Sequence, residues 1–187
     1  MNEVCPKDSL FTSDMGEHLS VALHFLRTRT PGAFTTCLGF GSMGSGVVSA
    51  IGMALGDSAP GGKKRRAFAI CGDGGFLMSG NELQSAVTHK APVTFVIMND
   101  GRYNMCHHGI KNLYGETPTC NLGGVDFAKV ADGFGAVGTV ARTLHDLTAA
   151  LKQMPDGPVV IDVRIDPDAR LDGSQREASL RQFQEKK

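Results

Sequence analysis

The sequence predicts an α/β protein with a doubly wound, mainly parallel sheet that is flanked by helices on both faces. Two apolar runs, residues 67–71 (AFAIC) and 93–98 (VTFVIM), have the continuous hydrophobicity of strands covered on both sides. Segments with a helical spacing of apolar residues alternate with the expected strands, which is typical of crossover helices. We therefore expect the ligand site at the carboxyl ends of the strands.

The other elements follow the same alternation. Two helix starts show a capping-box pattern, in which Ser79 precedes Glu82 and Thr143 precedes Asp146 by three positions. Apolar spacing predicts helices over residues 17–29, 46–55, 79–89, 125–133 and 147–154. Residues 33–38 and 159–165 are the remaining expected strands.

The chain has 187 residues, which is enough for one domain. We expect residues 1–12 to form an N-terminal lead-in and residues 13–166 to form the domain. The polar stretch at 167–187 is expected to be a C-terminal tail that is helical or frayed.

Charge and cysteine content restrict the class of protein. The 19 basic residues balance the 19 acidic ones, which argues against a nucleic-acid or anionic-membrane surface as the main function. The five cysteines form no CxxC pair and indicate free thiols in a reducing compartment. No long apolar run and no signal-peptide pattern are present, so we expect a cytoplasmic protein.

Glycine is the unusual residue of this chain. It accounts for 24 of 187 residues, about 13% against a usual ~7%, and half of these lie between Gly39 and Gly80. Residues 39–44 (GFGSMG) match the dinucleotide-binding pattern GxGxxG. That pattern also requires an acidic residue at the end of the next strand, and the nearby Asp57 lies in a predicted loop. An NAD(P)-binding Rossmann protein is thus a weaker alternative. Residues 39–44 are also explained without a ligand, by glycines that allow a helix to pack closely on the sheet.

Acidic residues follow both central strands. Asp73 lies in the run GDGG after residues 67–71, and Asp100 lies in the run NDG after residues 93–98. A carboxylate at a strand end can hold Mg²⁺ while glycine N–H groups bind phosphate, and two adjacent strand ends can share one cation. Either motif alone is also explained by an ordinary Asp-Gly turn. The two together, 27 residues apart, are more specific.

This pair of motifs resembles the thiamine diphosphate-binding motif. From about residue 12 to 166, the chain is similar to the diphosphate-binding (PP) domain of acetolactate synthase-like thiamine diphosphate enzymes. Five segments carry the resemblance in the right order: residues 13–18 (SDMGEH), 39–44 (GFGSMG), 99–105 (NDGRYNM), 126–136 (DFAKVADGFGA) and 157–163 (GPVVIDV).

The resemblance implies a magnesium site formed by Asp73, Asp100 and the backbone carbonyl of Arg102. The family usually has asparagine where this chain has Asp100. A carboxylate suits a hard cation, but it adds negative charge to a site that also receives a diphosphate. The family resemblance also implies that Gly74 and Gly75 donate backbone N–H groups to that diphosphate.

Further residues are assigned to the cofactor by the same resemblance. Gly16 and His18 are expected to reach the diphosphate, although a surface histidine is an alternative for His18. Met43 is expected to support the bent form of the cofactor, with core packing as its alternative. The backbone near Gly41 is expected to bind the aminopyrimidine. The remaining expected contacts are Ser42, Tyr103, Asn104 and Met105.

The resemblance also implies a partner. The family activates the cofactor with a glutamate of a second, pyrimidine-binding domain, which we expect on a separate α subunit in an α2β2 or larger heteromer. This chain would then be the β subunit of a 2-oxo acid decarboxylase or carboligase that yields an aldehyde or an acyloin. His107 and His108 are candidate proton relays, or residues of a solvated helix face. A non-catalytic cofactor-binding or assembly partner is the alternative function.

Overall fold

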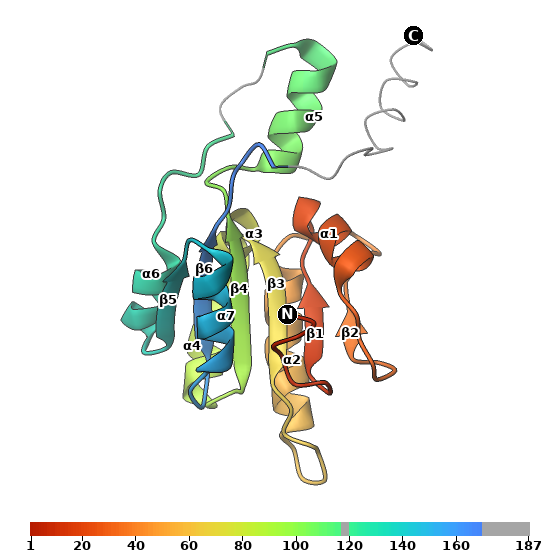
Figure 1. Cartoon of the computed structure of the whole chain (residues 1–187), viewed down its shortest axis with the longest axis vertical. Coiled ribbons are helices and arrows are strands. Elements are labelled where there is room, and N and C mark those ends of the chain that lie inside the picture. Colours follow the sequence, from red (N-terminus) through yellow and green to blue (C-terminus); the bar gives the residue numbers. More distant parts are fainter. Residues whose placement is uncertain (117–119, 170–187) are drawn as a thin grey trace.

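The computed structural model describes residues 1–116 and 120–169 of the chain. A six-stranded sheet forms its centre, in the order β2-β1-β3-β4-β6-β5 (Figure 1). Every adjacent pair of these strands is parallel. The predicted fold class is therefore confirmed.

Strands β3, β4 and β6 match strands that the sequence predicts, and the other three do not. The strands are β1 (Leu10–Ser13), β2 (Phe34–Thr35), β3 (Ala67–Gly72), β4 (Val93–Asn99), β5 (Val137–Ala141) and β6 (Val159–Arg164). Strands β1 and β5 were not predicted, and β1 lies largely within residues 1–12. Strand β2 is only two residues long, shorter than the expected strand over 33–38.

Seven α-helices are described, together with one short 3₁₀-helix at Gly80–Glu82. The α-helices are α1 (Glu17–Phe25), α2 (Ser45–Asp57), α3 (Asp73–Ser79), α4 (Leu83–Thr88), α5 (Asn104–Tyr114), α6 (Phe127–Phe134) and α7 (Leu144–Lys152). Helix α5 was not among the helices predicted from apolar spacing, and it projects beyond the carboxyl edge of the sheet (Figure 1). None of the helices in the described ranges is long and apolar enough to cross a membrane.

The sheet separates two hydrophobic cores, which confirms that helices cover both faces. On one face, residues of α2, α4 and α6 pack against β3 and β4. The ring of Phe76 meets those of Phe95 and Phe127 edge-on in this core, at centroid distances of 5.7 and 5.4 Å. On the other face, Leu151 of α7 packs in a second core with Phe68, which stacks on Phe11.

Only one of the two predicted capping boxes forms. The Thr143 hydroxyl accepts a hydrogen bond from the backbone N–H of Asp146, and the Asp146 carboxylate accepts one from the backbone N–H of Thr143. The prediction at Ser79 is wrong, because helix α3 already runs through Phe76 to Ser79, and the chain continues there as a 3₁₀-helix without a side-chain cap. Helix α3 was not predicted because its first turn contains Gly74 and Gly75, and glycine has a low helix propensity.

Replacing Thr143 by alanine is expected to lower the free energy of unfolding by about 1 kcal/mol, because the first turn of α7 loses its cap. Ser79→Ala provides the comparison, since Ser79 caps no helix, and it should cost clearly less. Urea denaturation of both variants measures the difference. Equal losses for the two variants would show that the capping box contributes nothing.

Candidate functional site

The site lies where the strand order reverses. The chain leaves β1 for β2 on one side, and then returns to form β3 on the other side of β1. In an open parallel sheet, such a reversal opens a crevice at the carboxyl ends of the two strands. Asp14 follows β1 directly, and Asp73 follows β3 directly. The loops that carry the predicted cofactor residues therefore begin at adjacent strand ends.

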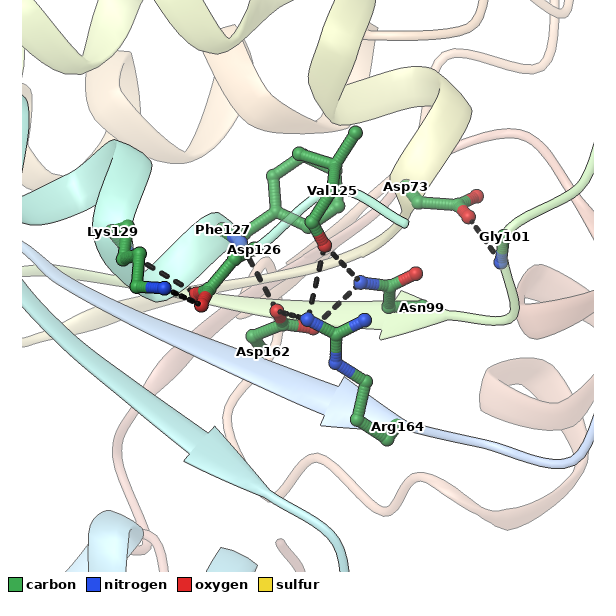
Figure 2. Close-up of polar contacts among 9 residues, drawn as sticks. All are labelled: Asp73, Asn99, Gly101, Val125, Asp126, Phe127, Lys129, Asp162 and Arg164. Carbon is green, nitrogen blue, oxygen red and sulfur yellow. Dashed lines mark hydrogen bonds and ion pairs between the residues drawn. The ribbon is translucent and has the colours of Figure 1, made fainter. Parts of the chain in front are cut away.

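Asp73 connects the ends of β3 and β4. Its side chain is buried, with 5% of the residue exposed. One carboxylate oxygen accepts a hydrogen bond from the N–H of Gly74 at 2.7 Å, and the other accepts one from the N–H of Gly101 at 2.7 Å (Figure 2). Asp100, next to Gly101, accepts a hydrogen bond from the N–H of Arg102 at 3.0 Å. The structure therefore brings together the loops of the two expected metal ligands.

The two carboxylates form an electrostatically unfavourable pair. Burial raises the pKa of Asp73 above its ordinary value. Burial also raises the pKa of Asp100 to about 6, and the nearby negative charge of Asp73 adds to that effect. A divalent cation between the two groups would remove this cost. No group of three His, Cys, Asp or Glu side chains within the described ranges is placed for a metal. Other oxygen ligands, such as the expected Arg102 carbonyl, are therefore needed.

We expect metal-free protein to gain stability from Asp100 as the pH falls. Because the folded-state pKa of about 6 lies above the ordinary value of 3.8, the folded chain takes up this proton first. Metal-free Asp100→Asn should therefore melt a few degrees above the unmodified chain at pH 7.5, since 1 kcal/mol corresponds to roughly 2–4 °C. The difference should shrink as the pH falls through 6. Thermal unfolding in EDTA measures this, and a constant difference between pH 5 and 8 would contradict it.

His18 faces the same strand end. A Cβ placed on Gly72 would lie 3.3 Å from the His18 ring, and one placed on Gly16 would lie 2.5 Å from it. Burial lowers the pKa of His18, while the charge of Asp14 opposes this effect. The Nε2 atom is fully buried and has no hydrogen-bond partner among the described residues. The structure therefore disfavours the surface alternative for His18 and leaves one ring nitrogen available to a ligand.

Three predicted residues from separate segments of the chain meet at Gly74. A Cβ at this position would lie 2.6 Å from Cε1 of Tyr103 and 3.2 Å from Cε of Met43. Met43 is 37% exposed, so ordinary core packing does not explain its place. Gly41 has a left-handed φ of 62°, which favours glycine in the loop before Met43. Ser42 lies in the same loop, and its carbonyl accepts a hydrogen bond from the Ser45 hydroxyl.

The residues at the start of α5 contact the chain that follows β6. The Asn104 side chain donates a hydrogen bond to the carbonyl of Pro167 at 2.6 Å, and Nε2 of His108 lies 3.3 Å from the same oxygen. His108 is therefore buried and does not belong to a solvated helix face. The neighbouring ring of His107 lies 5.4 Å from that of His108, and burial lowers the pKa of His107. Met105 is half-buried in the same turn.

The side chain of Arg102 turns toward the same segment. Its guanidinium pairs with Asp168 at 3.1 Å, and its backbone pairs with Asn121 in an isolated antiparallel bridge. The Nε atom of Arg102 and the Oδ1 atom of Asn104 are buried without a hydrogen-bond partner among the described residues. The guanidinium of Arg102 is cationic and paired with Asp168, so the side chain of this residue offers no ligand to a metal.

A buried polar network at the end of β4 was not predicted. Asp162 of β6 is fully buried; one of its oxygens accepts a hydrogen bond from the Asn99 side chain at 2.8 Å. The other accepts hydrogen bonds from the N–H of Phe127 at 3.0 Å and the guanidinium of Arg164 at 2.7 Å (Figure 2). Asn99 and Arg164 also donate to the carbonyl of Val125. The network fixes the segment before α6 against β4, the strand that Asp100 follows. Asp162, which interrupts the apolar run of β6, was the signal available in the sequence.

Comparison with known proteins identifies the family of this chain. Residues 14–163 match the C-terminal TPP-binding domain of thiamine pyrophosphate enzymes. The chain is 34% identical over 157 residues to acetolactate synthase of Bacillus subtilis, a match that covers 83% of this chain and 27% of that protein. It is 27% identical over 182 residues to 3D-(3,5/4)-trihydroxycyclohexane-1,2-dione hydrolase of the same organism, covering 92% and 28%.

Solved structures show the same similarity. The thiamine diphosphate-dependent 4-hydroxybenzoylformate decarboxylase of Rhodococcus jostii RHA1 superposes with a TM-score of 0.78 at 28% identity, over 88% of this chain and 31% of that one. Benzoylformate decarboxylase of Polynucleobacter necessarius shares the fold, with a TM-score of 0.81 at 24% identity over 91% and 32%. This chain spans less than a third of the length of these relatives. It belongs to the thiamine pyrophosphate enzyme family and contains that family's C-terminal TPP-binding domain.

Proposed function

We propose that this chain binds thiamine diphosphate and Mg²⁺ as the diphosphate-binding β subunit of a 2-oxo acid decarboxylase or carboligase. The observation that carries the proposal is the position of Asp73. This buried carboxylate joins two strand ends, lies near a second carboxylate and begins a helix whose first residues are glycines. Hard cations prefer oxygen ligands, and a diphosphate needs both a cation and free N–H donors.

The residues of the site fit this pair of ligands. Asp73 and Asp100 would hold the metal with the carbonyl of Arg102, and the metal would relieve their repulsion. The buried Nε2 of His18 lacks a partner among the described residues and would bind a diphosphate oxygen. Gly74 lies so close to Tyr103 and Met43 that a larger residue would displace them. Met43 itself is exposed enough to contact a ligand.

When bound, thiamine diphosphate supplies the carbon nucleophile and the electron sink on which decarboxylation of a 2-oxo acid depends. The residues of this chain would bind the cofactor and the metal and would hold them in a fixed orientation. Asp73 fixes the relative positions of the two metal-binding loops, because it accepts hydrogen bonds from both. His107 and His108 stand on the helix that follows the metal loop and are candidates for moving a proton at the substrate.

We further propose that a separate α subunit carries the pyrimidine-binding domain and its activating glutamate, in an α2β2 or larger heteromer. Exposed apolar residues lie on the loops and helices around the site: Leu38, Phe40, Met43, Leu77 and Met78. Phe40 has its whole side chain in solvent, at the tip of the loop that should approach the aminopyrimidine. A surface of this kind next to a ligand site favours a protein partner.

The test is reconstitution of activity. We expect this chain with thiamine diphosphate and Mg²⁺ to release no CO₂ from a panel of 2-oxo acids. Addition of a pyrimidine-domain protein encoded beside its gene should produce turnover, and Phe40→Ser should weaken the complex. Turnover by this chain alone would contradict the split arrangement. A stable cofactor-containing complex that decarboxylates none of the acids would favour the assembly function instead.

A further inference from the structure

Asp14 is a buried carboxylate that none of the site assignments above uses. It follows β1 directly, is 0% exposed, and its backbone N–H donates a hydrogen bond to the carbonyl of Ile70 in β3. A charge taken out of water is costly unless hydrogen bonds compensate it. The partners of Asp14 therefore indicate what it holds in place.

These partners belong to the loop before α2. One carboxylate oxygen accepts a hydrogen bond from the N–H of Gly44 at 2.8 Å. The other accepts one from the N–H of Gly46 at 3.0 Å and a weaker one from the Ser45 hydroxyl at 3.5 Å. Gly44 is the N-cap residue of α2 and has no side chain to supply a cap. A residue 30 positions earlier in the sequence thus caps α2 and fixes the end of the loop formed by residues 39–44.

The same carboxylate lies against Gly75 in the first turn of α3, where Gly74 and Gly75 are expected to bind the diphosphate. A Cβ placed on Gly75 would overlap the Asp14 oxygen that binds Gly44, so only glycine fits at this position. The charge of Asp14 also acts on His18, as shown by its effect on the pKa of that residue. One buried group is therefore in contact with the loop at residues 39–44 and with the first turn of α3, and it is close to His18.

We propose that Asp14 is a positioning residue that fixes the distance between the aminopyrimidine end and the diphosphate end of the cofactor site. This inference rests on the proposed binding of thiamine diphosphate. It predicts that Asp14 affects the binding of a ligand that spans both ends of the site more than the binding of one that occupies only the diphosphate end. Inorganic pyrophosphate with Mg²⁺ is such a short ligand.

The test compares the two ligands by titration calorimetry of the full chain. Asp14→Asn keeps the side-chain volume but replaces one of the two acceptor oxygens with an amide NH₂ group. Because that group is a donor, the variant can accept a hydrogen bond from the N–H of Gly44 or from that of Gly46, but not from both. We expect the affinity for thiamine diphosphate to fall about tenfold, as for the loss of one charge-assisted hydrogen bond, while that for pyrophosphate is retained. Asp57→Asn, at the other end of α2, should change neither affinity.

An equal loss for both ligands, or no loss for either, would overturn the role of Asp14. If the unmodified chain fails to prefer thiamine diphosphate over pyrophosphate, the proposed function fails, whatever the variant does. Amide hydrogen exchange in the unmodified chain provides a test that needs no folded variant. The N–H groups of Gly44 and Gly46 should be strongly protected before any cofactor is added. Rapid exchange at both would overturn the proposal.

Discussion

Replacing Asp73 by alanine is expected to abolish Mg²⁺-dependent binding of thiamine diphosphate, with a loss in affinity of roughly 100-fold or more. The change removes a metal ligand, and groups that only orient metal ligands already contribute 10–100-fold. It also leaves the N–H groups of Gly74 and Gly101 without the acceptor that joins their two loops. Titration calorimetry at saturating Mg²⁺ measures the loss.

A second substitution separates charge from geometry. Asp73→Asn retains one acceptor oxygen for the neighbouring N–H groups but lacks the charge that a cation needs. We expect it to bind the cofactor nearly as weakly as the alanine variant, whereas Asp156→Ala, at an exposed turn, should bind like the unmodified chain. If Asp73→Ala bound thiamine diphosphate with unchanged affinity, the assignment of the metal site would be wrong.

Asp162→Ala is expected to be the most destabilising of the substitutions considered, lowering the free energy of unfolding by about 3–5 kcal/mol. Removal of this buried carboxylate leaves the guanidinium of Arg164, the side chain of Asn99 and the N–H of Phe127 without their shared acceptor. A buried donor that has no acceptor costs free energy, because its lost hydrogen bonds to water are no longer replaced by one within the protein. Denaturant-induced unfolding at neutral pH measures the change.

Asp126→Ala is the matched control for that measurement. This carboxylate lies between Val125 and Phe127, whose backbone groups belong to the network. It caps α6 at the surface, where it accepts a hydrogen bond from the N–H of Lys129. Its loss should cost only about 1 kcal/mol. A loss below 1 kcal/mol for Asp162→Ala would mean that the network in Figure 2 does not stabilise the fold.

The central part of the fold could be predicted because its information is local. Strands β3 and β4 are buried on both faces and therefore read as continuous apolar runs. Strand β1 has the sequence LFTS, and two of its four residues are polar. It is a strand because it lies between β2 and β3, which supply its hydrogen bonds and bury it. Local sequence contains no such information.

The same distinction applies to the site. Asp73 and Asp100 were predicted because each directly follows a recognisable strand, and parallel strands end at the same edge. Asp14 and Asp162 were missed because their partners are distant in sequence: Gly44 lies 30 residues from Asp14, and Asn99 lies 63 residues from Asp162. Only the packing of the sheet shows what these buried carboxylates hold.

The central claim is that this chain binds the diphosphate of the cofactor through a divalent cation. Calorimetric titration of the chain with thiamine diphosphate and with thiamine, each in Mg²⁺ and in EDTA, tests it most directly. We expect tight binding only for thiamine diphosphate in Mg²⁺, with at least a tenfold loss when either the diphosphate or the metal is absent. Equal affinity for thiamine, or affinity for thiamine diphosphate that EDTA leaves unchanged, would contradict the claim.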